Sequence, residues 1–107
     1  MSDTFTLIRR LVASDEVRVS EHGYDELAED GITVSEILAG VNSGKMVEDY
    51  PEYPKGRSVL VLQLDNKGRV IHVVWGIPKG FERPAVLVTA YRPEPTRWDE
   101  RFMERRK

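Results

Sequence analysis

Several features that would identify a common class of protein are missing from this sequence of 107 residues. It has no cysteine, which excludes disulfides, thiolate metal ligands and a cysteine nucleophile. No segment reaches the roughly 20 apolar residues of a membrane span, and the N-terminus lacks the basic-then-apolar pattern of a signal peptide. We therefore expect a cytoplasmic protein without a membrane partner, folded as a single domain over residues 1–107.

Little in the chain indicates a metal or a cofactor. The two histidines, His22 and His72, are far apart in sequence, and no cluster of His with Asp or Glu has the spacing of metal ligands. Neither a Walker pattern nor a GxGxxG pattern is present. We expect a protein that uses no cofactor and no metal ion.

Charge is unevenly distributed, although the net charge is only −2. Residues 1–54 hold four Lys/Arg against twelve Asp/Glu, a net −8, and residues 55–107 hold twelve against six, a net +6. Such asymmetry is typical of a surface that faces a polyanion or a protein partner. It also fits an acidic helical layer packed beside a basic sheet. An acidic chain would bind nucleic acid only through a local patch.

The first half of the chain has the apolar spacing and the capping residues of helices. The spacing predicts a helix over residues 4–13 and a second over residues 21–29, with Ser20 as N-cap and Gly31 after its end. Tyr24, Leu27 and Ala28 are the expected buried face of the second helix. A capping-box pattern from Thr33 to Glu36 starts a third helix.

The second half has the short apolar runs and polar turns of a sheet. Strands are predicted over residues 45–50, 57–64, 69–75 and 84–91, the middle two forming a hairpin. Residues 96–107 fit a short helix with Trp98, Phe102 and Met103 on one side. The predicted class is α+β, with N-terminal helices on one face of a four-stranded antiparallel sheet and a short C-terminal helix.

The two histidines are the first candidates for chemistry, because imidazole titrates near neutral pH. His22 lies in the first turn of the second helix, where the helix dipole favours the neutral base while Glu21 and Asp25 favour the charged form. His72 lies in an apolar run expected to be a central strand. Each also fits a structural role, His22 as a surface residue and His72 as a hydrogen-bonded core residue.

Other candidates would bind phosphate. Tyr91 and Arg92 follow an apolar strand, where a guanidinium and a phenol can both meet a phosphate, or where Arg92 can simply pair with a carboxylate. Lys79 and Arg83 lie on a loop flanked by glycine over residues 76–83. The C-terminal tail is basic, through Arg97, Arg101, Arg105, Arg106 and Lys107, and such tails are usually solvated.

Five segments, taken in order, resemble a known family. They are Ser20-Glu21-His22, Asp30-Gly31-Ile32-Thr33 with Glu36-Ile37, Val47-Glu48-Asp49-Tyr50-Pro51, Gly68-Arg69-Val70-Ile71-His72-Val73-Val74 and Val88-Thr89-Ala90-Tyr91-Arg92-Pro93. Over residues 17–98 the chain resembles domain of unknown function 4258, a family regarded as related to RelE-like and BrnT-like ribonuclease toxins. The resemblance implies a RelE-like or barnase-like fold and an antitoxin partner. It matches the recurring histidines and tyrosine of the family to His22, His72 and Tyr91.

The leading hypothesis is a metal-independent endoribonuclease of a toxin–antitoxin module, cleaving RNA by 2′-hydroxyl attack. His22 and His72 are the candidates for its acid and base. Arg92, with Lys79 or Arg83, would hold the phosphate, and Tyr91 would orient it or donate a proton. The alternative is a non-catalytic module that binds RNA or protein with a toxin-like fold. A third hypothesis is a homodimer formed through a sheet edge or through the apolar residues of the C-terminal stretch.

Overall fold

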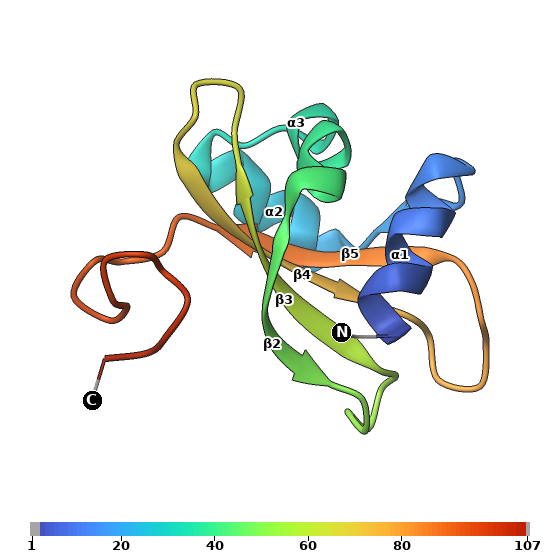
Figure 1. The fold of residues 1–107 in the computed structure, drawn as a ribbon. Helices are drawn as coiled ribbons and strands as arrows, with labels where there is room; N and C mark the ends of the chain where they lie inside the picture. The colour runs from blue at the N-terminus through green and yellow to red at the C-terminus, as the bar shows by residue number, and fades with distance from the viewer. Residues whose placement is uncertain (1–2, 107) are drawn as a thin grey trace.

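Three α-helices pack on one face of a five-stranded sheet in the computed structural model, which describes residues 3–106 except the side chain of Glu26 (Figure 1). In chain order the elements are α1 (Asp3–Ala13), β1 (Val17–Val19), α2 (Glu21–Asp30), α3 (Val34–Gly40), the 3₁₀ turn η1 (Val41–Ser43), β2 (Lys45–Tyr50), β3 (Ser58–Leu64), β4 (Val70–Gly76) and β5 (Ala85–Tyr91). The α+β class predicted from the sequence is confirmed.

The strand order is β1-β5-β4-β3-β2, which places β4 at the centre of the sheet. Neighbouring strands are antiparallel except β1 and β5, which are parallel. The four predicted strands are confirmed to within about one residue at each end. The prediction of only four strands is wrong. It misses β1 because three residues are too few to display an alternating pattern.

The predicted helix caps are confirmed. The Ser20 hydroxyl accepts from the Gly23 N–H, and Gly31 ends α2 in the left-handed region with φ of 65°. Thr33 and Glu36 form the reciprocal capping box of α3.

The predicted buried face of α2 is only partly right. Leu27 is buried, whereas Tyr24 is 58% exposed and Ala28 is also exposed. A Cβ on Gly23 would lie 3.0 Å from the Val88 carbonyl, so α2 rests on β5 through Gly23 and Leu27, four residues apart. Tyr24 and Ala28 are each one residue further along the helix and therefore point away from the sheet.

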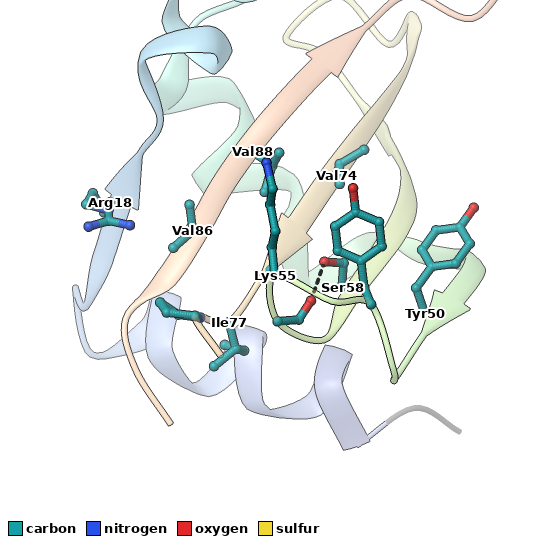
Figure 2. Close-up of a pocket in the computed structure, with 12 residues that line it drawn as sticks. Arg18, Tyr50, Lys55, Ser58, Val74, Ile77, Val86 and Val88 are labelled. Carbon is teal, nitrogen blue, oxygen red and sulfur yellow. Dashed lines mark hydrogen bonds between the residues drawn. The ribbon is translucent and has the colours of Figure 1, made fainter. Parts of the chain in front are cut away.

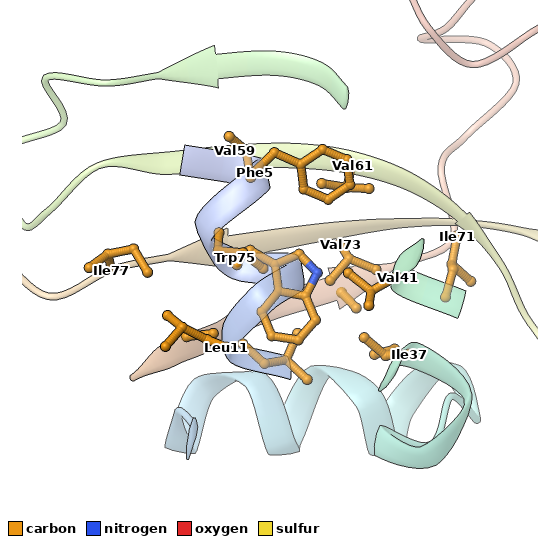
Figure 3. Packing of buried hydrophobic residues seen from close by; sticks show 14 of the residues in the cluster. Phe5, Leu11, Ile37, Val41, Val59, Val61, Ile71, Val73, Trp75 and Ile77 are labelled. Carbon is orange, nitrogen blue, oxygen red and sulfur yellow. The ribbon is translucent and has the colours of Figure 1, made fainter. Parts of the chain in front are cut away.

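The hydrophobic core lies between the helices and the sheet (Figure 3). Side chains of α1, such as Phe5, Ile8 and Leu11, pack with Ile37 of α3 against the helix-facing side chains of β3, β4 and β5. Trp75 is fully buried there, and a relay satisfies its polar atom. The Trp75 indole donates to Gln63 Oε1 at 3.1 Å, and the Gln63 amide donates to the Ile37 carbonyl at 2.9 Å.

The predicted C-terminal helix is wrong for the residues described. Residues 93–106, called here the C-terminal segment, form turns and a single antiparallel bridge between Trp98 and Arg105. The Asp99 carboxylate accepts from the Met103 N–H at 3.0 Å, and Phe102 has a φ of 58°, which a helix does not allow. The C-terminal segment lies across the sheet from the helices (Figure 1).

Candidate functional site

The candidate site is the face of the sheet that points away from the helices, called here the open face. Because side chains alternate along a strand, Ile71, Val73 and Trp75 enter the core while His72 and Val74 point to the open face. Strand pairing places matching residues of β1, β2, β3 and β5 beside them. These are Arg18, Glu48, Tyr50, Ser58, Leu60, Leu62, Val86 and Tyr91.

The C-terminal segment covers one end of the open face, over His72. The His72 ring meets Trp98 edge-on, with 4.4 Å between ring centroids, and meets Tyr91 at 5.5 Å. His72 Nε2 lies 2.8 Å from the Phe102 carbonyl oxygen, and Nδ1 lies 3.4 Å from the Tyr91 hydroxyl. His72 is fully buried and Trp98 nearly so. His72, one of the two candidate histidines, is therefore covered by residues of the C-terminal segment.

These contacts assign the protonation state of His72. Burial lowers the pKa of His72 below its ordinary value, although the hydrogen bond to the Phe102 carbonyl opposes that shift. A carbonyl only accepts, so Nε2 carries the proton of the neutral ring and Nδ1 is left with its lone pair. Burial also raises the pKa of Tyr91. At neutral pH the pair consists of an imidazole base and a protonated phenol.

An ion pair fastens the C-terminal segment to β2. The Arg105 guanidinium donates two hydrogen bonds to the Glu48 carboxylate, at 2.9 and 3.2 Å, and also lies 4.7 Å from the Trp98 ring centroid. The Tyr50 hydroxyl donates to the same carboxylate. Arg105 holds the pKa of Glu48 below its ordinary value. The Glu48 carboxylate is consequently charged at neutral pH and remains paired with Arg105.

A pocket of about 460 Å³ occupies the other end of the open face (Figure 2). Its floor is apolar and is formed by Val74, Val86 and Val88 with Ile77. Two tyrosines, two cationic side chains and Ser58 surround this floor, and the Ser58 hydroxyl donates to the Gly56 carbonyl at 3.1 Å. The tyrosines are Tyr50 and Tyr53, and the cations are Arg18 and Lys55. The size lies within the usual range for a small-ligand site.

The pocket is electrostatically suited to an anion. Arg18 and Lys55 line the pocket, and none of the described residues that line it is Asp or Glu. Among the side chains that the structure describes, neither cation has an ion-pair partner. Their charge is therefore available to a ligand, in a chain whose net charge is −2.

Comparison with known proteins gives one match. The family model described as Domain of unknown function (DUF4258) matches residues 19–92, more than half of the chain. The chain belongs to the DUF4258 family. No curated protein and no solved structure matches it. The sequence therefore identifies the family correctly, with a slightly wider span of residues 17–98.

The DUF4258 match extends from the end of β1 to the residue after β5. It contains His22, His72, Tyr91 and most of the pocket. It leaves out α1 and the C-terminal segment, which includes the residues that cover His72. In this member of the DUF4258 family, the cover over His72 lies outside the matched part of the chain.

The structure brings together only two of the predicted catalytic residues, His72 and Tyr91. His22 is exposed at the start of α2, on the helical layer, and no contact described here joins it to His72. Arg92 pairs with the buried carboxylate of Asp65 at 3.0 Å and donates to the Asp30 carbonyl at 3.2 Å. This is the carboxylate pairing that the sequence left open for Arg92.

The two predicted substrate-binding residues lie on the loop between β4 and β5. Arg83 is exposed and pairs with Glu16 at 3.2 Å. Lys79 is exposed, and its backbone N–H donates to the Lys55 carbonyl at 3.2 Å. Lys79 borders a shallower groove next to the pocket, and neither residue lines the pocket itself. Lys107, the last residue of the basic tail, lies outside the described residues.

Sequence reasoning misses the residues that form the pocket. Arg18 belongs to the strand that the pattern does not reveal, and Lys55 and Tyr53 belong to a loop whose only signal is its mixture of aromatic, proline and basic residues. Only their spatial arrangement makes them a site. In residues 3–106 there is no group of three or more His, Cys, Asp or Glu placed to hold a metal ion. That part of the chain also contains no helix long and apolar enough to cross a membrane.

Proposed function

We propose that this DUF4258 domain binds RNA on the open face of its sheet. The observation that carries the proposal is the pocket, where Arg18 and Lys55 flank an apolar floor and have no carboxylate partner among the described residues. A nucleic acid offers this surface a phosphate for the cations and a planar base for the apolar floor and the tyrosines. The expected relation of the DUF4258 family to RelE-like and BrnT-like ribonuclease toxins favours RNA over DNA as the ligand.

The test is the affinity for a fluorescein-labelled ten-nucleotide single-stranded RNA, measured by anisotropy over a range of salt concentrations. The affinity should fall steeply with salt, because binding to phosphates releases counterions. Arg18→Ala and Lys55→Ala should each weaken binding and flatten the salt dependence. Lys67→Ala, on the exposed turn between β3 and β4, removes the same charge away from the pocket and should change neither. RNA that fails to bind at low salt would refute this function.

A second function, RNA cleavage without a metal ion, is favoured by the pairing of His72 with Tyr91. In this reaction a base takes the proton of the 2′-hydroxyl, whose oxygen attacks the adjacent phosphorus. The 5′-oxygen leaves with a proton from an acid, which yields a 2′,3′-cyclic phosphate and a 5′-hydroxyl. The neutral imidazole of His72 suits the base and the protonated hydroxyl of Tyr91 suits the acid. His22 and Arg92 remain candidates only if RNA reaches from the open face to their positions.

Cleavage requires the C-terminal segment to leave His72, because Phe102 and Trp98 occupy the space in front of the ring. Arg105→Ala should therefore increase cleavage of a labelled RNA, and adding His72→Ala to it should abolish the gain. On expression, His72→Ala and His22→Ala should each relieve growth arrest if cleavage is toxic. A wild-type protein and an Arg105→Ala variant that both leave RNA intact would exclude cleavage while leaving RNA binding in place.

The resemblance to the DUF4258 family implies an antitoxin partner, and the absence of cysteine favours a cytoplasmic location. Both belong to this proposal. The homodimer hypothesis is separate from it. Concentration-dependent sedimentation would distinguish a homodimer from a monomer that associates only with a second protein.

A further inference from the structure

We infer that the pocket on the open face is a subsite for one unpaired nucleotide of single-stranded RNA, with its base on the valine floor and its phosphate on Arg18 and Lys55. This inference rests on the proposed RNA binding and names the form of RNA that is bound. A base held in a pocket must be unstacked and unpaired, so the subsite selects single strands over duplex.

The floor and the tyrosines supply the surface for the base. Val74 of β4 and Val86 and Val88 of β5, which are neighbouring strands, together form an apolar floor (Figure 2). Tyr53 lines the same pocket, and its side chain is 52% exposed although it is aromatic. A partly exposed aromatic ring beside an apolar floor is the arrangement on which bases stack, and it accepts any base because every base has a π-face.

Arg18 and Lys55 line the same pocket as the valine floor, so they can meet the phosphate on the ribose of a nucleotide whose base lies on that floor. Arg18 is on the edge strand β1, directly opposite Val86 in the pairing of β1 with β5. Lys55 extends over the pocket from the loop that precedes β3 (Figure 2). Two positive charges from different elements therefore border the same floor. A purely apolar ligand would leave both charges unused, whereas a nucleotide uses the charges and the floor together.

The loop that carries Tyr53 and Lys55 is held in place before any ligand binds. The Ile77 N–H donates to the Arg57 carbonyl at 3.0 Å, and the Gly56 N–H donates to the Tyr53 carbonyl at 2.9 Å. Gly56 has a φ of 130°, and a Cβ there would lie 1.9 Å from the Ile77 carbonyl oxygen. The two loops beside the pocket thus approach too closely for any other residue. A preformed rim lowers the entropy lost on binding.

The test compares a ten-nucleotide single-stranded RNA with a strand of the same length that is abasic at every position, against wild type and Tyr53→Ala. For wild type, the abasic strand should bind about tenfold more weakly, because it offers no base to the pocket. Tyr53→Ala should weaken binding of the intact strand by a similar factor and should have little effect on the abasic strand. Tyr53→Phe should restore the affinity, because the ring and not the hydroxyl makes the contact.

Tyr24→Ala, an exposed tyrosine on α2, is the matched control and should leave both affinities unchanged. Intact and abasic strands that bind equally, each insensitive to Tyr53→Ala, would overturn the base subsite while RNA binding stands. No binding of either strand would remove the proposed function itself. Equal binding of a duplex and a single strand would also contradict the inference. Preferential binding of an acidic peptide, lost in Tyr53→Ala, would assign the pocket to a protein ligand instead.

Discussion

At the scale of single residues, His72 shows how far a sequence identifies a site. Its place in a central strand could be predicted from apolar residues on both sides, and the structure confirms a buried histidine with hydrogen-bond partners. The identity of those partners could not be predicted. Phe102 contacts His72 through its backbone carbonyl, and a backbone atom leaves no trace in the pattern of side chains.

The neutral state of His72 predicts a pH dependence of stability. Because burial lowers the pKa of His72 below its ordinary value of 6.5, the unfolded chain binds the proton more readily than the folded one. The contribution of His72 is therefore complete above about pH 6.5 and is lost as the pH falls through the folded pKa. Urea unfolding should show this loss for wild type. In His72→Gln, which keeps an N–H donor near Phe102, the pH dependence should be shallower, and identical curves would contradict the assignment.

Arg92 gives a second prediction at this scale, because the structure pairs it with Asp65 instead of leaving it for a phosphate. The Asp65 side chain is buried, and although burial alone would raise the pKa of this carboxyl, backbone N–H groups of Arg69 and Lys67 and the Arg92 guanidinium bring it to about 2. Arg92→Ala should cost about 2 kcal/mol of unfolding free energy. It should leave RNA affinity nearly unchanged.

A double variant provides the control for Arg92. If Arg92 acts mainly through Asp65, then Arg92→Ala should cost less in an Asp65→Ala background than in wild type, as in any interacting pair. If the stability losses of Arg92→Ala and Asp65→Ala are additive and Arg92→Ala also greatly weakens RNA binding, then Arg92 has the phosphate-binding role predicted from the sequence.

At the scale of elements, helices with strong local signals could be predicted and pieces defined by distant contacts could not. Ser20, Gly31 and the Thr33–Glu36 capping box are local, and they give the ends of α2 and α3 to within a residue or two. β1 exists because it pairs with β5, about seventy residues away. The C-terminal segment has the apolar spacing of a helix but folds on the sheet surface, where Trp98 packs against His72 and Arg105 pairs with Glu48.

The attachment of the C-terminal segment predicts the behaviour of Arg105→Ala. Removing the paired hydrogen bonds to Glu48 and the contact with the Trp98 ring should cost about 1 kcal/mol, since both groups are partly exposed. The detached population of the C-terminal segment should rise about fivefold. Acrylamide quenching should then increase for Trp98, while Trp75 in the core stays protected.

Arg101→Ala removes the same charge from an exposed position of the same segment and is the matched control. It should leave the quenching close to that of wild type. Equal quenching of wild type, Arg101→Ala and Arg105→Ala would mean that the ion pair does not hold the segment on the open face.

At the scale of the whole molecule, charge divides between the two sides of the sheet only in part. The acidic first half forms the helices and β2, which agrees with the alternative of an acidic helical layer packed beside a basic sheet. Arg18, however, belongs to that acidic half and lines the pocket. The proposed RNA binding therefore depends on a local cationic pocket and not on net charge. The opposite, helical side should stay free of RNA, because α2 and its exposed residues are mainly acidic.

The most direct test of RNA binding on the open face is amide chemical-shift mapping of the ¹⁵N-labelled protein titrated with a ten-nucleotide single-stranded RNA. The largest changes are expected at Lys55, Val74 and Val86, around the pocket, with small changes at Tyr24 and Ala28 on the outer side of α2. Changes confined to α2, or no changes at low salt, would exclude RNA binding on the open face.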